Sequence, residues 1–187
     1  MRRSKEEVIS PVSALGVRIG IVAADYHKEI YQRLLDGAET AFHKAGGLDA
    51  DLRRATVDGI FDLPSVVAQM LRRSDIDAVV VIGCVVRGET RHDEFIVNAA
   101  FTQFTQLAVA HAKPVALAVL TVECLSQAKA RSGGIKGDAG AFAMNAALRT
   151  HAQSKESKGG SRGKGESEAE EACGRFSRLA VSHSQDL

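Results

Sequence analysis

Three continuous runs of apolar residues limit the folds open to this chain more than any other feature of its sequence. They are VRIGIVAA at 17–24, DAVVVIG at 77–83 and PVALAVL at 114–120. Short runs that are rich in branched side chains are typical of strands covered on both faces, as in a parallel sheet. The shorter segment 52–57 is interpreted as a further strand.

Segments with apolar residues at helical spacing follow the predicted strands. This alternation of strands and helices predicts an α/β fold, since parallel strands need crossover helices that cover both faces of the sheet. We therefore expect a three-layer α/β/α, flavodoxin-like fold around a parallel four-stranded sheet. The predicted helices cover residues 30–42, 63–71, 93–112, 123–131 and 138–149, the last two on either side of a glycine-rich break at 132–137.

The composition changes near the end of the chain. From Gln153 onward, Ser, Gly, Lys and Glu dominate, and such a segment buries too little apolar surface to offset the entropy of ordering. A short apolar run at 176–181 is isolated within it. We therefore divide the chain into an N-terminal arm (1–14), one α/β domain (15–152) and a low-complexity tail (153–187) that we expect to be disordered.

The overall composition excludes several classes of function. The formal net charge is +1, so no global field favours nucleic acid or an anionic membrane. Cys84, Cys124 and Cys173 form no C-x-x-C pair, so neither a disulfide framework nor a metal site is predicted. The N-terminus lacks the apolar stretch of a secretory signal, and no run is long enough to cross a bilayer. We expect a cytoplasmic protein without a metal centre.

The polar loop that follows the run 77–83 is the strongest candidate for chemistry. In open α/β sheets, ligands bind at the carboxyl ends of the strands. Gly88, Glu89 and Thr90 lead into a predicted helix, where backbone N–H groups and the helix dipole favour an anion. His92 lies one residue before that helix and is placed to transfer protons. No nucleotide-binding glycine motif accompanies this loop.

Each candidate residue also has an ordinary structural interpretation. A single histidine such as His92 is more often a packed or surface residue, and Arg131 at a helix end is a common C-terminal cation. Tyr26 and Phe61 could pack in the core. Cys84 is interpreted as a small buried hydrophobe, because no paired base is evident. The histidines without metal-ligand spacing are interpreted as surface residues: His27, His43, His111 and His151.

The segment IGCVVRGETRHDEFI at 82–96 resembles the signature of lumazine synthases, G-x-V-I-R-G-x-T-x-H followed by an acidic or aromatic pair. Several other stretches are similar to that family in order and spacing. They are VRIGIVAADYHKEI, VDGIFDLP, DIDAVVVIG, KPVALAVLT and LSQAKARSGG, with IKG where the family has N-K-G. The resemblance covers about residues 15–150.

The resemblance implies an enzyme of riboflavin biosynthesis. Family members condense 5-amino-6-ribitylaminouracil with 3,4-dihydroxy-2-butanone 4-phosphate, both small-molecule substrates, to 6,7-dimethyl-8-ribityllumazine. Phosphate and water leave, and neither metal nor organic cofactor takes part. The resemblance further implies a homo-oligomer, a pentamer or a multiple of it, with active sites between neighbouring subunits. It makes riboflavin synthase a candidate partner.

The resemblance also assigns roles to residues. The catalytic histidine falls on His92, and the phosphate-binding residues fall on Gly88, Glu89, Thr90 and Arg131. The residues expected to contact the pyrimidine and the ribityl chain are Tyr26, Gly59, Phe61, Asp62, Val85, Val86, Leu117 and Lys136.

Some of these positions depart from the family pattern. Tyr26 stands where Phe or Trp is usual, Asp62 replaces Glu, and Leu117 replaces an aromatic residue. The segment from Arg131 to Lys136 is also shorter than usual. These departures leave a second interpretation open, a catalytically weak scaffold that binds a flavin or pterin. A third, an unrelated flavodoxin-like FMN carrier, leaves the Arg-Gly-x-Thr-x-His loop unexplained.

Overall fold

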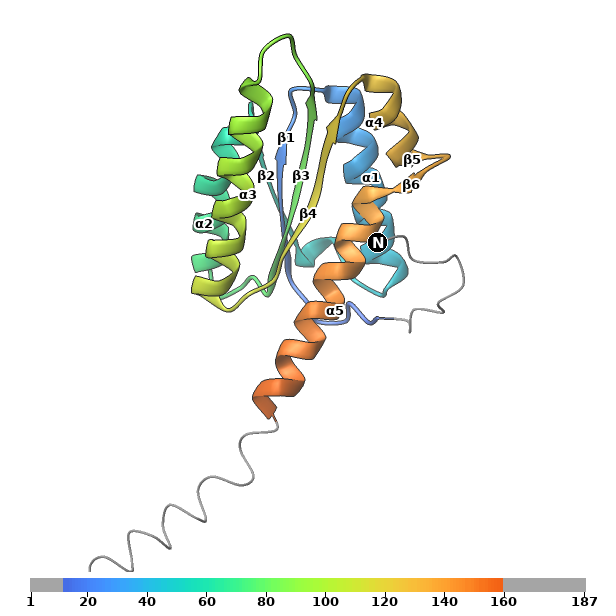
Figure 1. Cartoon of the computed structure of the whole chain (residues 1–187). Coiled ribbons are helices and arrows are strands. Elements are labelled where there is room, and N and C mark those ends of the chain that lie inside the picture. Colours follow the sequence, from blue (N-terminus) through green and yellow to red (C-terminus); the bar gives the residue numbers. More distant parts are fainter. Residues whose placement is uncertain (1–11, 160–187) are drawn as a thin grey trace, which may run out of the picture. The chain divides into compact units, whose positions relative to one another are not determined.

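The computed structural model describes residues 12–159 (Figure 1), so most of the predicted N-terminal arm and the run 176–181 lie outside the described residues. The strands of the main sheet are β1 (Ile19–Ala24), β2 (Leu52–Val57), β3 (Ala78–Val86) and β4 (Val115–Val122). The helices are α1 (Lys28–Lys44), α2 (Leu63–Arg72), α3 (His92–His111), α4 (Leu125–Arg131) and α5 (Ala139–Gly159). A short hairpin, β5 (Ser132–Gly134) and β6 (Gly137–Asp138), connects α4 to α5.

The main sheet has the strand order β2-β1-β3-β4, and every neighbouring pair is parallel. The predicted four-stranded parallel sheet is therefore confirmed. The central strand β1 is buried along its whole length, and β3 is buried except at its last two residues. The edge strands β2 and β4 mix buried and exposed positions. The apolar runs at 17–24 and 77–83 thus correspond to the central strands, which have neighbours on both sides and helices on both faces, whereas the run at 114–120 corresponds to the edge strand β4.

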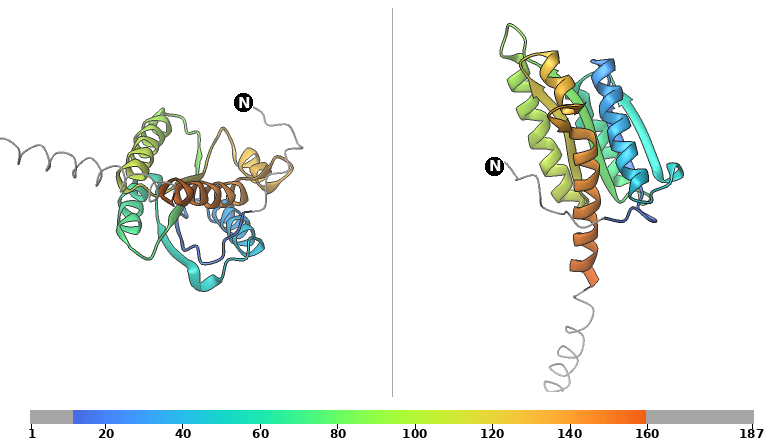
Figure 2. Two further views of the ribbon diagram at one scale, coloured as in Figure 1. Left: turned by 90° about the horizontal axis from the view of Figure 1, so that it is seen from below. Right: turned by 90° about the vertical axis from the view of Figure 1, so that its right-hand side faces the viewer.

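Helices cover both faces of this sheet. Helices α2 and α3 lie on one face, and α1, α4 and the first part of α5 lie on the other (Figures 1 and 2). Adjacent residues of β1 point to opposite faces, so that Ile21 belongs to the apolar cluster with Leu34 of α1, while Val22 belongs to the cluster with Phe104 of α3. The three-layer α/β/α architecture expected from the sequence is therefore present.

The glycine-rich break at 132–137 folds differently from the open loop implied by its composition. It forms the antiparallel β5–β6 hairpin, in which Gly133 and Gly137 have φ values of 86° and 106°. Residues with a side chain rarely adopt this left-handed conformation, so the two glycines make the tight reversal possible. The backbone N–H of Lys136 donates to the carbonyl of Ala130, 2.7 Å away, and ties the hairpin to α4.

Helix α5 extends further than the sequence predicts. It runs to Gly159 rather than ending near Arg149, and His151 is only 8% exposed, so its interpretation as a surface residue was wrong. The physical reason is helical periodicity, since Met144 and Leu148 of the same helix are buried and His151 lies next on that face. None of the helices within residues 12–159 combines the length and the apolar character needed to span a bilayer.

Candidate active site

A pocket of about 460 Å³ opens at the carboxyl ends of β1 and β3. Three connections build it: the turn after β1, the turn after β2, and the loop from β3 into α3. This is the edge of an open α/β sheet where ligands are expected to bind. The lining residues are Tyr26, His27, Gly59, Ile60, Cys84, Val85, Val86, Gly88, Thr90, His92, Asp93 and Ile96.

The pocket brings together predicted site residues that are far apart in the sequence. It contains Tyr26 and Gly59 from the first two turns, and Val85 and Val86 from the end of β3. From the third loop it contains Gly88, Thr90 and His92. It does not contain Glu89, Phe61, Asp62, Leu117, Arg131 or Lys136. A single chain therefore assembles one part of the predicted site.

Ion pairs hold both ends of the β3–α3 loop. Arg87 lies 3.3 Å from Glu123 of the loop after β4, and Arg91 lies 2.7 Å from Glu94 in the first turn of α3. Between them, a side chain at Gly88 would meet no heavy atom within 4 Å. Contacts within the chain do not explain why this position is a glycine. The loop backbone is thus open to close approach from outside the chain.

His92 is the first residue of α3, one position inside the helix rather than before it. Its side chain is exposed and faces the pocket together with Thr90. The histidine therefore occupies the place where helix-start N–H groups point outward without helical partners. An anion bound there would lie beside a group that can transfer protons.

The floor of the pocket is apolar. Ile60 and Cys84 are each 8% exposed, and Val85 and Ile96 complete this surface. Burial raises the pKa of the Cys84 thiol to about 11, because the thiolate would lose its hydration. The interpretation of Cys84 as a small buried hydrophobe is confirmed, and the thiol is a poor nucleophile near neutral pH.

The two aromatic candidates do not pack in the core, so that interpretation was wrong. Tyr26 is 79% exposed and Phe61 is 68% exposed. Tyr26 stands at the mouth of the pocket, with the ring of His27 edge-on at a centroid distance of 5.0 Å. Phe61 borders a different, apolar hollow between α2 and α3. Only Tyr26 therefore presents its ring to the pocket within one chain.

His27 is a pocket residue that the sequence analysis missed. It was interpreted as a surface residue, but it lines the same pocket as His92. No spacing motif marks it in the sequence. The available signal was its position directly after Tyr26, at the carboxyl end of a buried strand.

Asp62 has a local structural contact. It ends a 3₁₀ turn formed by Ile60–Asp62, and its Oδ2 accepts a hydrogen bond from the backbone N–H of Gly59 at 3.2 Å. The carboxylate thus fixes the backbone of Gly59, which does line the pocket. Within one chain, Asp62 acts on the pocket through this turn.

The remaining predicted residues lie on β4, α4 and the hairpin. Leu117 is on the edge strand β4, and Lys136 is exposed in the turn between β5 and β6. Arg131 ends α4, and its Nη1 donates to the carbonyl of Gln127 at 3.0 Å, as expected of a C-terminal helix cation. None of these three side chains lines the pocket of its own chain.

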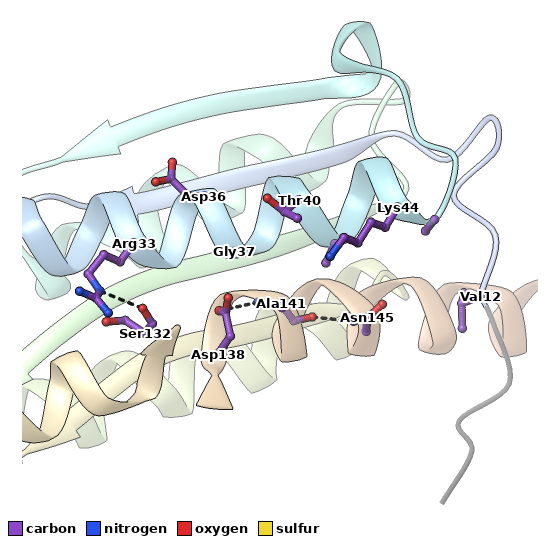
Figure 3. A pocket seen from close by; sticks show the side chains of 12 residues that line it. Val12, Arg33, Asp36, Gly37, Thr40, Lys44, Ser132, Asp138, Ala141 and Asn145 are labelled. Atoms are coloured by element: carbon purple, nitrogen blue, oxygen red, sulfur yellow. Dashed lines mark hydrogen bonds between the residues drawn. The ribbon is translucent and has the colours of Figure 1, made fainter. Parts of the chain in front are cut away.

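A larger hollow of about 650 Å³ lies between α1 and the segment from β5 to α5 (Figure 3). Its polar groups are largely bonded to nearby backbone. Arg33 Nε donates to the carbonyl of Ser132 at 3.0 Å, and Asp138 Oδ1 accepts from the N–H of Ala141 at 3.0 Å. The first contact ties α1 to β5, and the second caps the start of α5. Both groups are used within the fold, so we do not assign the active site to this hollow.

Comparisons with known proteins agree with the family that the sequence signature indicates. The family model for 6,7-dimethyl-8-ribityllumazine synthase matches residues 16–155. A 6,7-dimethyl-8-ribityllumazine synthase of Thermus thermophilus is 37% identical over 145 residues, which are 77% of this chain and 92% of the relative. The enzyme of that name from Kineococcus radiotolerans is 40% identical over 141 residues, 74% of this chain and 86% of the relative. The chain therefore belongs to the 6,7-dimethyl-8-ribityllumazine synthase family.

Proposed function

We propose that this chain condenses 5-amino-6-ribitylaminouracil with 3,4-dihydroxy-2-butanone 4-phosphate to 6,7-dimethyl-8-ribityllumazine, a step of riboflavin biosynthesis. The observation that carries the proposal is the convergence of His92, Thr90, Gly88 and Tyr26 in one pocket of a member of this family. Gly88, Thr90 and His92 come from the β3–α3 loop and match the family signature at 82–96. Tyr26 comes from the turn after β1, in another stretch that is similar to the family.

The β3–α3 loop suits the phosphate of the ketone substrate. The open space beside Gly88 lets a phosphate approach the backbone N–H groups, and the start of α3 adds the positive end of a helix dipole. His92 at that end can remove or donate the protons that accompany phosphate departure. Stabilising the growing charge on the leaving phosphate lowers the barrier to elimination.

The opposite wall suits the pyrimidine. Tyr26 presents an exposed ring on which a heteroaromatic base can stack, and the chain around Gly59, Val85 and Val86 offers backbone groups nearby. Holding the amine of one substrate against the ketone of the other supplies much of the rate enhancement through proximity. The chemistry requires no metal or organic cofactor.

We further infer that the complete site forms between two copies of the chain in a cytoplasmic homo-oligomer, a pentamer or a multiple of it. Arg131, Lys136 and Leu117 lie outside the pocket of their own chain, which supports a contribution from a neighbour. Helix α3 also exposes Phe95 and Val109, apolar side chains that a subunit interface would cover. Riboflavin synthase, the enzyme that would consume the product, is the candidate partner.

A catalytically weak scaffold that binds flavins or pterins is not favoured. Such a protein would need the stacking residue Tyr26 but not the histidine and the open phosphate loop. This chain combines Tyr26 with Gly88, Thr90 and His92 in one pocket, which supports turnover.

The experiment that tests the proposal supplies both substrates to the purified protein and follows lumazine fluorescence together with phosphate release. We expect equal amounts of the two products, and neither product when either substrate is omitted. Tight binding of the pyrimidine without product or phosphate would contradict the proposal and favour the scaffold.

A further inference from the structure

The candidate active site holds a second imidazole in addition to that of His92. His27 follows β1 and immediately precedes α1, and it lines the pocket from the wall formed by that turn. His92 lines it from the β3–α3 loop. The two histidines are 65 positions apart in the sequence, and the crossover topology brings them to one cavity.

We propose that His27 is a second proton-transfer residue of this site, which moves protons in the amine–ketone condensation while His92 serves the phosphate elimination. This inference rests on the proposed function and deepens it. The structural argument has three parts: the position of the ring, its freedom from a helix-capping contact, and the charges that surround it.

The ring of His27 stands edge-on to the ring of Tyr26. Its centroid lies 5.0 Å from that of Tyr26, and the two planes are 86° apart, an edge-to-face arrangement that aromatic rings favour. If Tyr26 stacks on the pyrimidine, the adjacent imidazole lies beside the substrate that carries the reacting amine. His92, in contrast, lies beside the loop that suits the phosphate.

The nitrogens of His27 are not used to cap α1. The residue stands at the N-cap position of that helix, yet its side chain makes no capping hydrogen bond. The free backbone N–H groups of the first turn therefore receive no hydrogen bond from the imidazole. The ring instead faces the pocket, partly exposed, where a substrate can reach it.

The condensation needs a group that accepts and returns protons. The amine nitrogen attacks the ketone carbon, the N–C bond forms, and the carbonyl electron pair moves to oxygen. Two protons leave the nitrogen and two arrive on the oxygen, so that water departs as the C=N bond forms. A neutral imidazole can take each proton from nitrogen and deliver it to oxygen, with no net gain or loss.

The charged and titratable groups around His27 come from several elements. Asp25 precedes it, and Lys28 and Glu29 follow it on α1. From α4, Lys129 faces the same turn and pairs with Glu29 at 2.7 Å. Across the pocket lie Cys84, Asp93 and His92. Glu29 and Lys129 pair with one another and do not line the pocket. The titratable groups that share the pocket with His27 are those of Tyr26, Cys84, Asp93 and His92.

The test compares His27→Asn with the matched control His43→Asn in the full-length protein. Asparagine keeps a polar side chain of similar size but cannot carry a proton at neutral pH. His43 is an exposed histidine in the last turn of α1, outside the pocket. For each protein, kcat and both KM values are measured from pH 5 to 9, with the thermal midpoint, and phosphate release is timed in a single turnover.

We expect His27→Asn to lower kcat by about 10- to 100-fold, the range for loss of a general acid–base group. The two KM values and the thermal midpoint should stay close to those of the wild type. One ionisation should disappear from the pH profile of kcat, and phosphate release in a single turnover should become slower because Schiff-base formation limits it. His43→Asn should match the wild type in every measurement.

Two results would overturn the inference while leaving the proposed function intact. Unchanged kcat in His27→Asn would show that the imidazole transfers no proton. A loss of activity with an unchanged pH profile and a lowered thermal midpoint would assign His27 a structural role at the start of α1. Absence of product from the wild-type protein would instead overturn the proposed function, and this inference with it.

Discussion

Two regions of the chain carry residues expected at the active site, and they differ in how those residues are used within one chain. At the carboxyl ends of β1 and β3, Tyr26 and His92 face an open pocket. In the segment from α4 to the start of α5, polar groups are bonded to nearby backbone: Arg131 to Gln127, and Asp138 to Ala141. The side chains of the first region are accessible from the pocket. Those of the second region make hydrogen bonds that stabilise the local fold.

This difference shows which groups one chain places in its own pocket and which it does not. A pocket with a stacking ring, a histidine and an open anion loop can bind and orient substrates. It lacks a guanidinium that would pair with phosphate in a fork. Arg87 begins the β3–α3 loop but does not line the pocket, and its guanidinium is paired with Glu123. In the homo-oligomer that we propose, Arg131 in the second region of a neighbouring copy supplies this cation.

The largest effect is expected from the pocket region. His92→Ala should lower kcat by about 10- to 1,000-fold, because a general acid–base group is lost. The thermal midpoint should not change, since the side chain is exposed. Steady-state kinetics and a thermal melt check both expectations, with His43→Ala as the control. Wild-type rates in His92→Ala would remove His92 from the mechanism, whereas a loss smaller than tenfold would leave proximity as the main source of rate.

The next largest effect is expected from a substitution in the second region, and it should change KM for only one of the two substrates. Arg131→Ala should raise KM for the butanone phosphate about 10- to 100-fold, the equivalent of one hydrogen bond between charged groups. KM for the pyrimidine should change little, because the guanidinium would contact only the phosphate. Arg131→Lys should lie between the two, since lysine keeps the charge but loses the fork. Equal increases in both KM values would indicate a purely structural role at the end of α4.

A mixing experiment tests whether the two regions meet across subunits. The His92→Ala and Arg131→Ala proteins are unfolded together in equal amounts and refolded. If each site takes His92 from one copy and Arg131 from another, random assembly leaves about one site in four intact. At a butanone phosphate concentration well below the KM of Arg131→Ala, activity should then rise to about a quarter of the wild-type value, well above either parent. A mixture that equals the average of its parents would place both residues in the same chain's site.

The sequence predicted the main sheet because burial on two faces leaves a direct record, the continuous apolar runs of β1 and β3. It did not predict the β5–β6 hairpin, whose short strands depend on the left-handed φ values of Gly133 and Gly137 rather than on an apolar pattern. The end of α5 was also misplaced. Polar residues after His151 resemble a linker in composition, although the helix continues through them.

The candidate site was predictable to a different degree at each residue. His92, Gly88 and Thr90 belong to one short motif, so the sequence alone brought them together. His27 belongs to no motif, and only the three-dimensional pocket places it with His92. The assignment of Arg131 comes from the resemblance alone, because this residue does not line the pocket of its own chain.

The smallest effect is expected from a truncation at the end of the chain, outside both regions. The buried face of α5 includes Met144, Leu148 and His151, whereas the side chains of residues 155–157 are exposed. A protein that ends at Gly159 keeps this face, and half of the residues it loses are Ser, Gly, Lys or Glu, which bury little apolar surface. We therefore expect its thermal midpoint and specific activity to equal those of the full chain.

As the contrast, a protein that ends at Asn145 loses Leu148 and His151. Its free energy of unfolding should fall by about 2–5 kcal/mol, the cost of removing a large buried side chain. A fall of many degrees in the longer truncation would show instead that residues 160–187, and the apolar run at 176–181 above all, contribute to the stability of the domain.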